Sequence, residues 1–373
     1  MLNIEKVIRG HETAESRWAR FGPYYAMFPV EFAFDVVEKY SKENDYIIDP
    51  FAGRFSSIFA GSFLKRNSTG IEINPIGWLY GSVKVNPANK NKVINRLYEI
   101  YNKRNYYSKM AENLPEFYLL CFSLEVRKFL LSARKNLNWK KSKTDATLMS
   151  ILLVYLQGKV GEGISNQLKM TKSMGMNYCL NWWKKNNFNN PPEIDIINFF
   201  LKKIDWRYEK GKPHLDKANI IFGNSLKELP KIIRKSNENK LKYSLLFTSP
   251  PYCSVTDYHI DQWLRMWLLG GSEFPKALDE KYKGRFINRE EYHNLLEKVF
   301  NLSSLLMKRK SVIYVRTDYR SFTYETTLNV LKKNFPKHDY EIFERPLENK
   351  KSQTELFGFK PEKKCEIDIV MSK

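Results

Sequence analysis

Cysteine and histidine are scarce in this chain of 373 residues, and neither residue type is clustered. The four cysteines lie far apart and form no CxxC pair, and the five histidines are equally scattered. Structural zinc sites and disulfide frameworks need closely spaced ligands or paired cysteines. The spacing therefore argues against both, and we expect reduced thiols and no bound metal.

Long apolar runs are also missing. No stretch reaches the roughly 20 residues of a transmembrane helix. Residues 1–16 (MLNIEKVIRGHETAES) contain no apolar signal region. These absences predict a cytoplasmic protein without a membrane partner.

Acidic residues are few for a chain so rich in basic ones. There are 41 Asp and Glu against 62 Lys and Arg, which gives a formal net charge of +21 and a pI of about 9.5. An excess of this size attracts polyanions, so nucleic acid is the expected partner. Hydrophobic residues make up 43% of the sequence, enough for a real core. The 14% of aromatic residues fits either core packing or a stacking surface for bases.

Strand and helix signals alternate in two parts of the chain. Residues 45–49 predict a buried strand, residues 56–65 a helix, and residues 68–73 a second strand. This order is a βαβ unit and implies a parallel sheet. The alternation resumes with strands expected at 218–222, 243–247 and 311–315, and with a closing antiparallel hairpin expected from 340–343 and 366–370.

The part between them, residues 86–214, has a different character. Apolar residues recur there at helical spacing, and strand signals are scarce. Between Arg127 and Pro192 there are 12 Lys and Arg but only two acidic residues. We therefore predict one α/β domain built from residues 1–85 and 215–373, interrupted by a mostly helical, basic insertion that recognises DNA.

The strongest chemical signal is Thr248-Ser249-Pro250-Pro251-Tyr252, directly after a predicted buried strand. Proline has a fixed φ and no N–H, so two in succession make a rigid loop with outward carbonyls. A serine hydroxyl and a backbone carbonyl held there are two acceptors that would draw the nitrogen of a base amine toward tetrahedral geometry. The tyrosine offers a flat face for an extruded base. An ordinary Pro-Pro turn is the alternative, but open α/β sheets bind ligands at the carboxyl ends of their strands.

A second signal follows the first predicted strand. Asp49-Pro50-Phe51-Ala52-Gly53 is a turn with small residues, and Glu72-Ile73 closes the second strand about 20 residues later. Such a turn lets the backbone approach a bound nucleoside, and a carboxylate at that distance accepts hydrogen bonds from both ribose hydroxyls. A plain tight turn and a solvated glutamate would leave the same pattern.

Together, residues 49–53, 70–75 and 248–252 resemble the cofactor and catalytic motifs of amino-methylating DNA methyltransferases. The resemblance covers roughly residues 21–75 and 220–373. It implies a Rossmann-like class I methyltransferase fold, which is an α/β, doubly wound, mostly parallel sheet with a closing antiparallel hairpin. It also implies S-adenosyl-L-methionine as cofactor, double-stranded DNA of a prokaryotic nucleoid as substrate, and a restriction endonuclease as a possible partner.

The resemblance also implies a role for each matching residue. Asp49 and the backbone of Pro50, Phe51, Ala52 and Gly53 would hold the methionine end of the cofactor. Glu72, with Ile73, would bind its ribose, and Asn224 would lie near its adenine. Ser249 and the Pro250 carbonyl would accept hydrogen bonds from the target amine, Pro251 would keep the loop rigid, and Tyr252 would stack on the flipped base. Residues 21–29 correspond loosely to a further cofactor-contacting motif.

The sequence departs from the family pattern at three points. Arg54-Phe55 stand where the family continues its turn with a second small residue, which predicts an altered cofactor loop. Asn224 stands where an aspartate is common. The insertion lies between the second and third strands and fits no standard subgroup.

Five functions remain open on these residues. A serine ahead of Pro-Pro-Tyr is the usual pattern for cytosine N4, so we favour N4 over adenine N6 as the methylated position. An RNA amine methyltransferase can share both motifs, although no RNA-binding appendage is recognisable. A DNA-binding module of weak activity would fit the irregular Arg54-Phe55 turn. A small-molecule methyltransferase fits the charge of +21 poorly.

Overall fold

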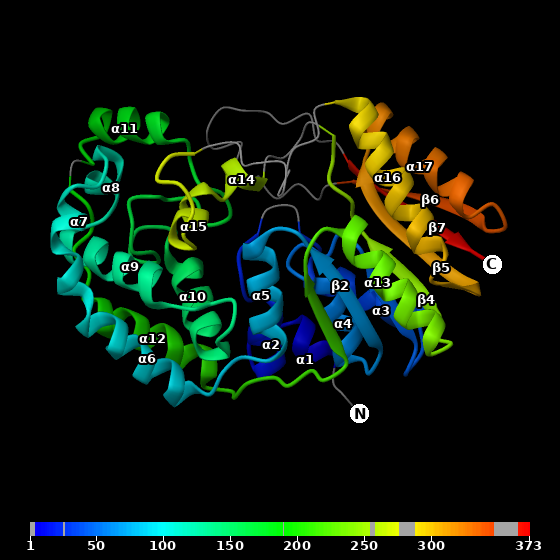
Figure 1. Cartoon of the computed structure of the whole chain (residues 1–373), viewed down its shortest axis with the longest axis horizontal. Coiled ribbons are helices and arrows are strands. Elements are labelled where there is room, and N and C mark those ends of the chain that lie inside the picture. Colours follow the sequence, from blue (N-terminus) through cyan, green and yellow to red (C-terminus); the bar gives the residue numbers. More distant parts are fainter. Residues whose placement is uncertain (1–3, 25–26, 189, 254–257, 276–287, 347–364) are drawn as a thin grey trace.

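The computed structural model describes residues 4–24, 27–188, 190–253, 258–275, 288–346 and 365–373. Two regions lie side by side in it, one built around a β-sheet and one of helices (Figure 1). Helix α5 (Pro75–Val85) lies where they meet. Among the described residues, no helix has the length and apolar character to cross a membrane.

Each predicted strand is present in a single seven-stranded sheet of order β3-β2-β1-β4-β5-β7-β6. Strand β7 runs antiparallel to both of its neighbours, and the other pairs are parallel. This confirms the mostly parallel sheet with its closing hairpin. The strands are β1 (Tyr46–Asp49), β2 (Asn67–Glu72), β3 (Ala218–Phe222), β4 (Tyr243–Thr248), β5 (Met307–Asp318), β6 (Asp339–Pro346) and β7 (Cys365–Ser372).

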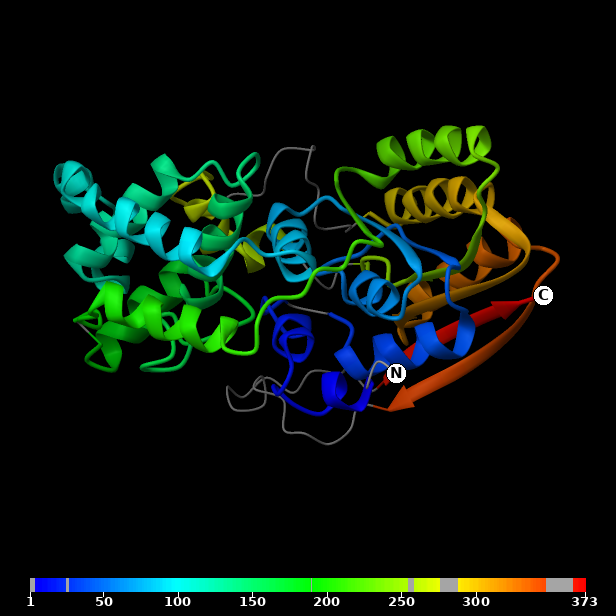
Figure 2. The same ribbon diagram turned by 90° about the horizontal axis from the view of Figure 1, so that it is seen from below.

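Helices cover both faces of the sheet because its strands are apolar on both sides (Figure 2). In β1, Ile47 packs on one face and Ile48 on the other. Helices α3 (Val30–Tyr40) and α4 (Ser56–Phe63) supply the core on the Ile47 face. The opposite core comes from α13 (Ser225–Glu238), α16 (Arg289–Ser304) and α17 (Ser321–Asn334).

Residues 86–214, which we call the helical region, contain no strand among those that the structure describes. The helices are α6 (Lys90–Asn102), η1 (Arg104–Tyr107), α7 (Ser108–Glu112), α8 (Glu116–Cys121), α9 (Leu124–Asn136), α10 (Lys143–Tyr155), α11 (Met176–Lys185) and α12 (Ile196–Tyr208). Their core also includes one side of α5, through Ile76, Leu79 and Tyr80. The predicted helical character of the insertion is confirmed.

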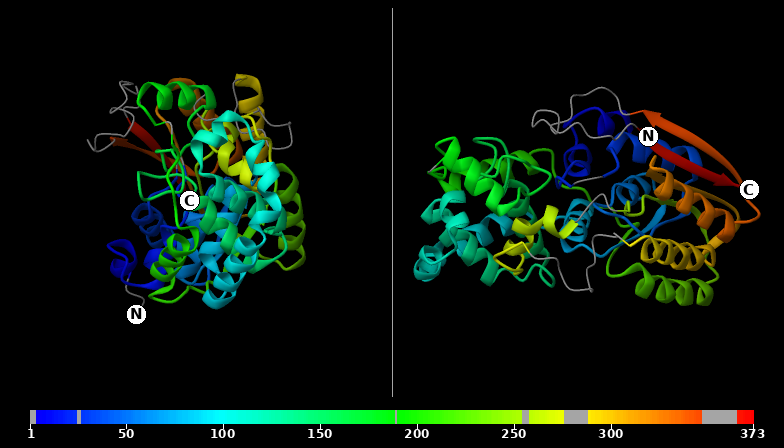
Figure 3. Two further views of the ribbon diagram at one scale, coloured as in Figure 1. Left: turned by 90° about the vertical axis from the view of Figure 1, so that its left-hand side faces the viewer. Right: turned by 90° about the horizontal axis from the view of Figure 1, so that it is seen from above.

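The helical region also takes in residues from beyond its predicted end. Two short helices, α14 (Tyr258–Asp261) and α15 (Trp263–Leu268), follow β4 in the sequence. Trp263, Leu264, Trp267 and Leu268 are buried in the same core as α8 to α10. Figure 3 shows the two short helices, in yellow, beside the helices of this region. The chain therefore leaves the sheet after β4, adds these helices to the helical region and returns for α16.

The short N-terminal helices α1 (Ile4–Ile8) and α2 (Ala14–Ala19) lie beneath the junction of the two regions. Trp18 of α2 is fully buried, and its ring lies 5.2 Å from that of Phe21 and 5.2 Å from that of Tyr208 in α12. The segment that follows α2 is thus anchored to the helical region before it reaches the sheet edge.

Candidate active site

The predicted site residues gather at the carboxyl edge of the sheet. In the parallel register, Asp49 of β1 lies opposite Gly70 of β2, and Glu72 lies opposite Phe222 of β3. Strand β4 pairs with β1 on its other side, which brings Thr248 beside Asp49. We call residues 50–55 the first-strand loop and residues 249–253 the fourth-strand loop.

A buried carboxylate joins these two loops. Asp49 is 1% exposed, and its Oδ1 accepts hydrogen bonds from Thr248 Oγ1 at 2.6 Å and from the Phe51 amide at 3.1 Å. Its Oδ2 accepts one from Ser57 Oγ at the start of α4. Burial raises the pKa of Asp49 to about 6, against the opposing effect of these donors. The carboxyl group is thus enclosed by protein donors and fixes both loops to one strand end.

Glu72 is the second buried carboxyl group of the site. Its Oε2 accepts from the Gly53 amide at 2.7 Å and its Oε1 from the Asn74 amide at 2.6 Å. Burial raises the pKa of Glu72 to about 8. The end of β2 therefore holds the first-strand loop through a direct contact to its backbone.

Helix α5 approaches the first-strand loop closely. A Cβ on Gly77 would lie 2.5 Å from the Gly53 carbonyl oxygen, so only glycine fits there. Asn74 caps α5 by accepting from the Ile76 amide at 2.9 Å, while its Nδ2 is buried without a hydrogen-bond partner. A buried unpaired donor is costly, and one at this position suits a polar ligand.

The departure at Arg54-Phe55 has a clear structural form. Phe55 takes the left-handed conformation, at φ 63° and ψ 37°, and its side chain is fully buried. The ring occupies the space beside Gly70 and Gly81, where a Cβ would come within 2.8 Å and 2.2 Å of it. The turn therefore keeps the left-handed geometry that glycine usually supplies, with an aromatic side chain packed under it.

Arg54 points away from Phe55, toward residues 21–29. Its Nη1 donates to the Gly22 carbonyl at 3.2 Å, and Ser56 Oγ donates to the Phe28 carbonyl at 3.2 Å. Burial lowers the pKa of Arg54 to about 10. The described part of segment 21–29 thus lies beside the first-strand loop; Tyr25 and Ala26 are outside the described residues.

The fourth-strand loop holds its serine and tyrosine together. Ser249 is half-buried and donates from Oγ to the Tyr252 hydroxyl oxygen at 3.3 Å. Tyr252 is only 7% exposed, so its ring lies within the protein here and is not an open stacking face. Pro250 is buried and Pro251 half-buried.

Arg320 fastens the far end of the same loop. Its Nη2 donates to the Cys253 carbonyl at 2.9 Å, and its Nε donates to Asp318 Oδ2 at 2.6 Å. Asp318 is buried at the carboxyl end of β5. The loop is thus tied to β1 at one end and to β5 at the other. Sequence patterns give no signal for Arg320, because its partner is a backbone carbonyl 67 positions away.

Asn224 is the N-cap residue of α13, a role that was not predicted for it. Its Oδ1 caps α13 by accepting from the Leu226 amide at 2.9 Å, which is the usual use of asparagine at a helix start. The amide group that remains to face a ligand is therefore its NH₂. The next residue, Ser225, donates from Oγ to the Pro50 carbonyl and links β3 to the first-strand loop. Among the described residues, no three His, Cys, Asp or Glu gather as metal ligands.

Residues 4–76 match the N6/N4 methyltransferase family model, described as DNA methylase. In this segment the chain is similar to the amino-methylating DNA methyltransferases. The matched segment contains Asp49, the first-strand loop and Glu72, and ends in the first turn of α5. With the strand order above, the expected Rossmann-like methyltransferase fold is confirmed.

The solved structures similar to this chain have low sequence identity to it. A protein from Streptococcus mutans named as a SAM-dependent methyltransferase has 8% identity and a TM-score of 0.32, over 92% of this chain and 49% of its own. A methyltransferase complexed with SAH has 8% identity and a TM-score of 0.30, over 91% and 48%. The rRNA methyltransferase aviRa from Streptomyces viridochromogenes has 10% identity and a TM-score of 0.32, over 98% and 96%. This chain spans about half the length of the first two. No curated protein matches the sequence.

Proposed function

We propose that this protein transfers a methyl group from S-adenosyl-L-methionine to the exocyclic N4 amine of a flipped cytosine in double-stranded DNA. The observation that carries the proposal is the hydrogen bond from Thr248 to Asp49. It holds the Ser-Pro-Pro-Tyr sequence beside the first-strand loop at one sheet edge, where a methyl donor and an acceptor base would meet. The net charge of +21 favours DNA as the substrate.

The residues around the first-strand loop fit the cofactor. Glu72 has lone pairs beyond those used by Gly53 and Asn74, and these suit ribose hydroxyl groups. The NH₂ of Asn224 suits a ring nitrogen of adenine, with Ile73 beside it in the sequence. The backbone of Phe51 to Gly53 would hold the methionine part. When bound, the cofactor supplies an electrophilic methyl group on a sulfonium.

We assign Asp49 a positioning role. Its two oxygens already serve Thr248, Phe51 and Ser57, and the carboxyl group is 1% exposed. It therefore aligns the loops that touch the cofactor and the base. Hydrogen bonds of this kind to a buried charged group are each worth about 1.5–3 kcal/mol.

The fourth-strand loop would prepare the amine for attack. Ser249 donates its hydroxyl hydrogen to Tyr252, which leaves its lone pairs to accept from the amine. The Pro250 carbonyl would accept the second amine hydrogen. Two such acceptors localise the nitrogen lone pair toward the methyl group, so proximity and orientation supply most of the acceleration. The ring of Tyr252 would have to move outward from its buried position to stack on the base.

Substitution of Ser249 and Tyr252 tests the assignment. We expect Ser249→Ala and Tyr252→Ala each to lower radiolabelled methyl transfer to duplex DNA at least about 100-fold, since each removes part of the acceptor arrangement. Heats of S-adenosyl-L-methionine binding should stay unchanged, because neither residue belongs to the first-strand loop. Ser272→Ala, an exposed serine outside the site, is the matched control. Near-normal transfer by both variants would remove the loop from the active site.

The methylated atom and the substrate are separate measurements. Mass spectrometry of nucleosides from DNA of expressing cells distinguishes N4-methylcytosine, which we expect, from N6-methyladenine. Parallel reactions with duplex DNA and tRNA distinguish a DNA substrate from an RNA one. Preferential labelling of tRNA would contradict the proposal.

A further inference from the structure

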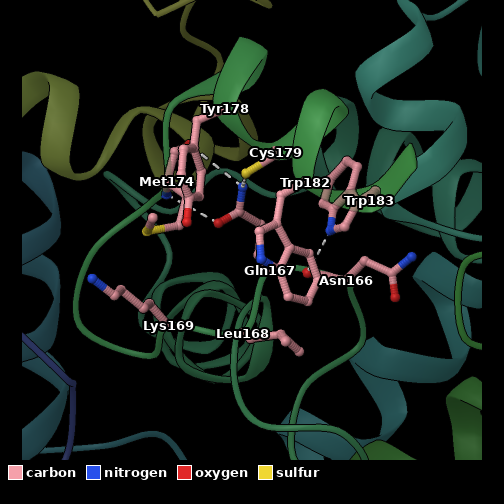
Figure 4. A pocket seen from close by; sticks show the side chains of 9 residues that line it. All are labelled: Asn166, Gln167, Leu168, Lys169, Met174, Tyr178, Cys179, Trp182 and Trp183. Carbon is pink, nitrogen blue, oxygen red and sulfur yellow. Dashed lines mark hydrogen bonds between the residues drawn. The ribbon is translucent and has the colours of Figure 1, made fainter. Parts of the chain in front are cut away.

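A pocket in the helical region lies outside the site described above. It has about 400 Å³ of empty space, including the part open to solvent. Its walls are mainly apolar and aromatic, and none of the residues that line it is acidic. They are Asn166, Gln167, Leu168, Lys169, Met174, Tyr178, Cys179, Trp182 and Trp183 (Figure 4).

The back of the pocket is rigid. Gln167 is 1% exposed; its Nε2 donates to Cys179 Sγ at 3.1 Å, and its Oε1 accepts from the Met174 amide at 3.0 Å. Trp183 is 1% exposed and donates from Nε1 to the Asn166 carbonyl at 3.2 Å. The side-chain amide of Gln167 and the indole N–H of Trp183 thus hold α11 against residues 166–174 (Figure 4). They are therefore not available as the main recognition groups for a ligand.

The open side of the pocket carries aromatic rings. Tyr178 is 48% exposed and Trp182 is half-buried, and both project from α11 (Figure 4). Large exposed apolar side chains grouped around a hollow are characteristic of binding sites. A planar ring would gain contact with the indole of Trp182 without needing specific hydrogen bonds.

The surroundings of the pocket are basic. Lys169 lines it, and Lys185 follows Trp182 and Trp183 in the last turn of α11. Lys184 in the same turn forms an ion pair with Glu116 at 2.9 Å. An aromatic hollow bordered by lysines matches a nucleotide, whose base is planar and whose phosphate is anionic. An apolar peptide side chain would make no use of the lysines.

The pocket is also connected to the segment that follows the fourth-strand loop. The Met174 carbonyl accepts from Trp263 Nε1 at 3.1 Å, and the Ser173 amide donates to the Asp261 carbonyl at 2.7 Å. Gln262 Nε2 donates to the Thr171 carbonyl at 2.8 Å. Residues 261–263, which follow the fourth-strand loop in the sequence, thus support one wall of the pocket. Helices α11 and α14 both lie along the upper side of the molecule in Figure 1.

We infer that this pocket binds one unpaired base of the DNA by stacking on Trp182 and Tyr178, with the lysines at the adjoining phosphates. The inference rests on the proposed DNA substrate but not on methyl transfer. The bound base is separate from the one whose amine meets Ser249. Because the walls offer few free polar groups, the pocket selects for an unpaired base more than for a particular base.

The test compares two labelled duplexes, one fully paired and one with a single unpaired thymine. Thymine has no exocyclic amine, so the fourth-strand loop does not account for a preference. We expect the full-length protein to bind the unpaired duplex more tightly in fluorescence anisotropy, and Trp182→Ala to reduce this preference about 10-fold, in line with stacking of one base. Trp182→Phe should retain most of the preference because a ring remains.

Two further variants keep the test decisive. Tyr178→Ala changes an exposed side chain and should lower the preference even if Trp182→Ala is poorly folded. Tyr106→Ala, on a residue that is 86% exposed in the same region, is the matched control and should keep it. Equal preference in the wild type, Trp182→Ala and Tyr178→Ala, or no preference in the wild type, would overturn the inference. Loss of methyl transfer and cofactor heat with the preference intact would instead contradict the proposed function alone.

Discussion

Phe55 provides a sharp test of how the first-strand loop is built. Its side chain is fully buried, so Phe55→Ala should cost about 3–5 kcal/mol from lost burial and the cavity left behind. Alanine would still sit at φ 63°, where a residue with a Cβ is disfavoured by roughly 1–2 kcal/mol. Phe55→Gly removes the same ring and also relieves this conformation. We therefore expect Phe55→Gly to be more stable than Phe55→Ala by about 1 kcal/mol, although glycine normally destabilises.

Gly81 supplies the second half of the same test. A Cβ on Gly81 would lie 2.2 Å from the Phe55 ring, so Gly81→Ala should destabilise the wild-type protein. In the Phe55→Gly background the ring is gone, and alanine is better than glycine inside helix α5 by about 1 kcal/mol. The same substitution should then become neutral or stabilising. The sign of its effect on the free energy of unfolding should reverse.

Urea denaturation of the wild type, the three single variants and the Phe55→Gly, Gly81→Ala double variant measures both effects. Midpoints and slopes give the free energies, and the double-mutant cycle isolates the coupling of the two positions. If Phe55→Gly is less stable than Phe55→Ala, the left-handed conformation is not a source of strain. If Gly81→Ala has the same effect in both backgrounds, the ring does not occupy the space beside α5. Either result would refute the account of the loop.

Three further predictions concern charge. Burial raises the pKa of Glu72 from 4.5 to about 8. Its protonated form therefore contributes stability that is complete below pH 4.5 and is lost as the pH rises toward 8. Over this range the free energy of unfolding should fall less in Glu72→Gln than in the wild type. Arg320→Ala should lower kcat about 10-fold without changing cofactor affinity, since it frees the Cys253 carbonyl, and Arg320→Lys should restore part of the rate. DNA affinity should fall steeply between 50 and 200 mM salt, by roughly 10³-fold if six phosphates are neutralised. If Lys185 contacts one phosphate, Lys185→Ala should reduce the slope of log K against log salt by about 1. A salt-independent affinity would assign the positive charge to another use.

The sheet could be predicted from the sequence because its strands carry local signals. Ile47 and Ile48 are consecutive apolar residues that pack on opposite faces, as a central parallel strand requires. A turn follows each strand, and parallel strands end at one edge, so the proximity of Asp49 and Thr248 followed from the topology. The position of Glu72 could be inferred in the same way.

The remaining features depend on contacts between distant parts of the chain. Trp263 and Trp267 follow the fourth strand in sequence but are buried with residues of α8 to α10, and no local pattern indicates that choice. The contact of Arg320 with a backbone carbonyl leaves no pairing of residue types to recognise. The capping role of Asn224 does have a local sequence signal, an asparagine directly before a helix. The prediction assigned this residue to adenine instead.

Some of the basic side chains are buried and others are exposed. Only the exposed ones can contact DNA phosphates. Arg127 donates to the Phe122 carbonyl, Arg134 to the Gly271 carbonyl, and the fully buried Arg265 to the Leu153 carbonyl. Carbonyls near helix ends carry partial negative charge, and these guanidinium groups satisfy them inside the helical region. Their charge counts toward the net +21, yet it is committed to holding helices together. The charge that meets phosphate is therefore expected from exposed lysines such as Lys185, at the end of the helix that presents Trp182.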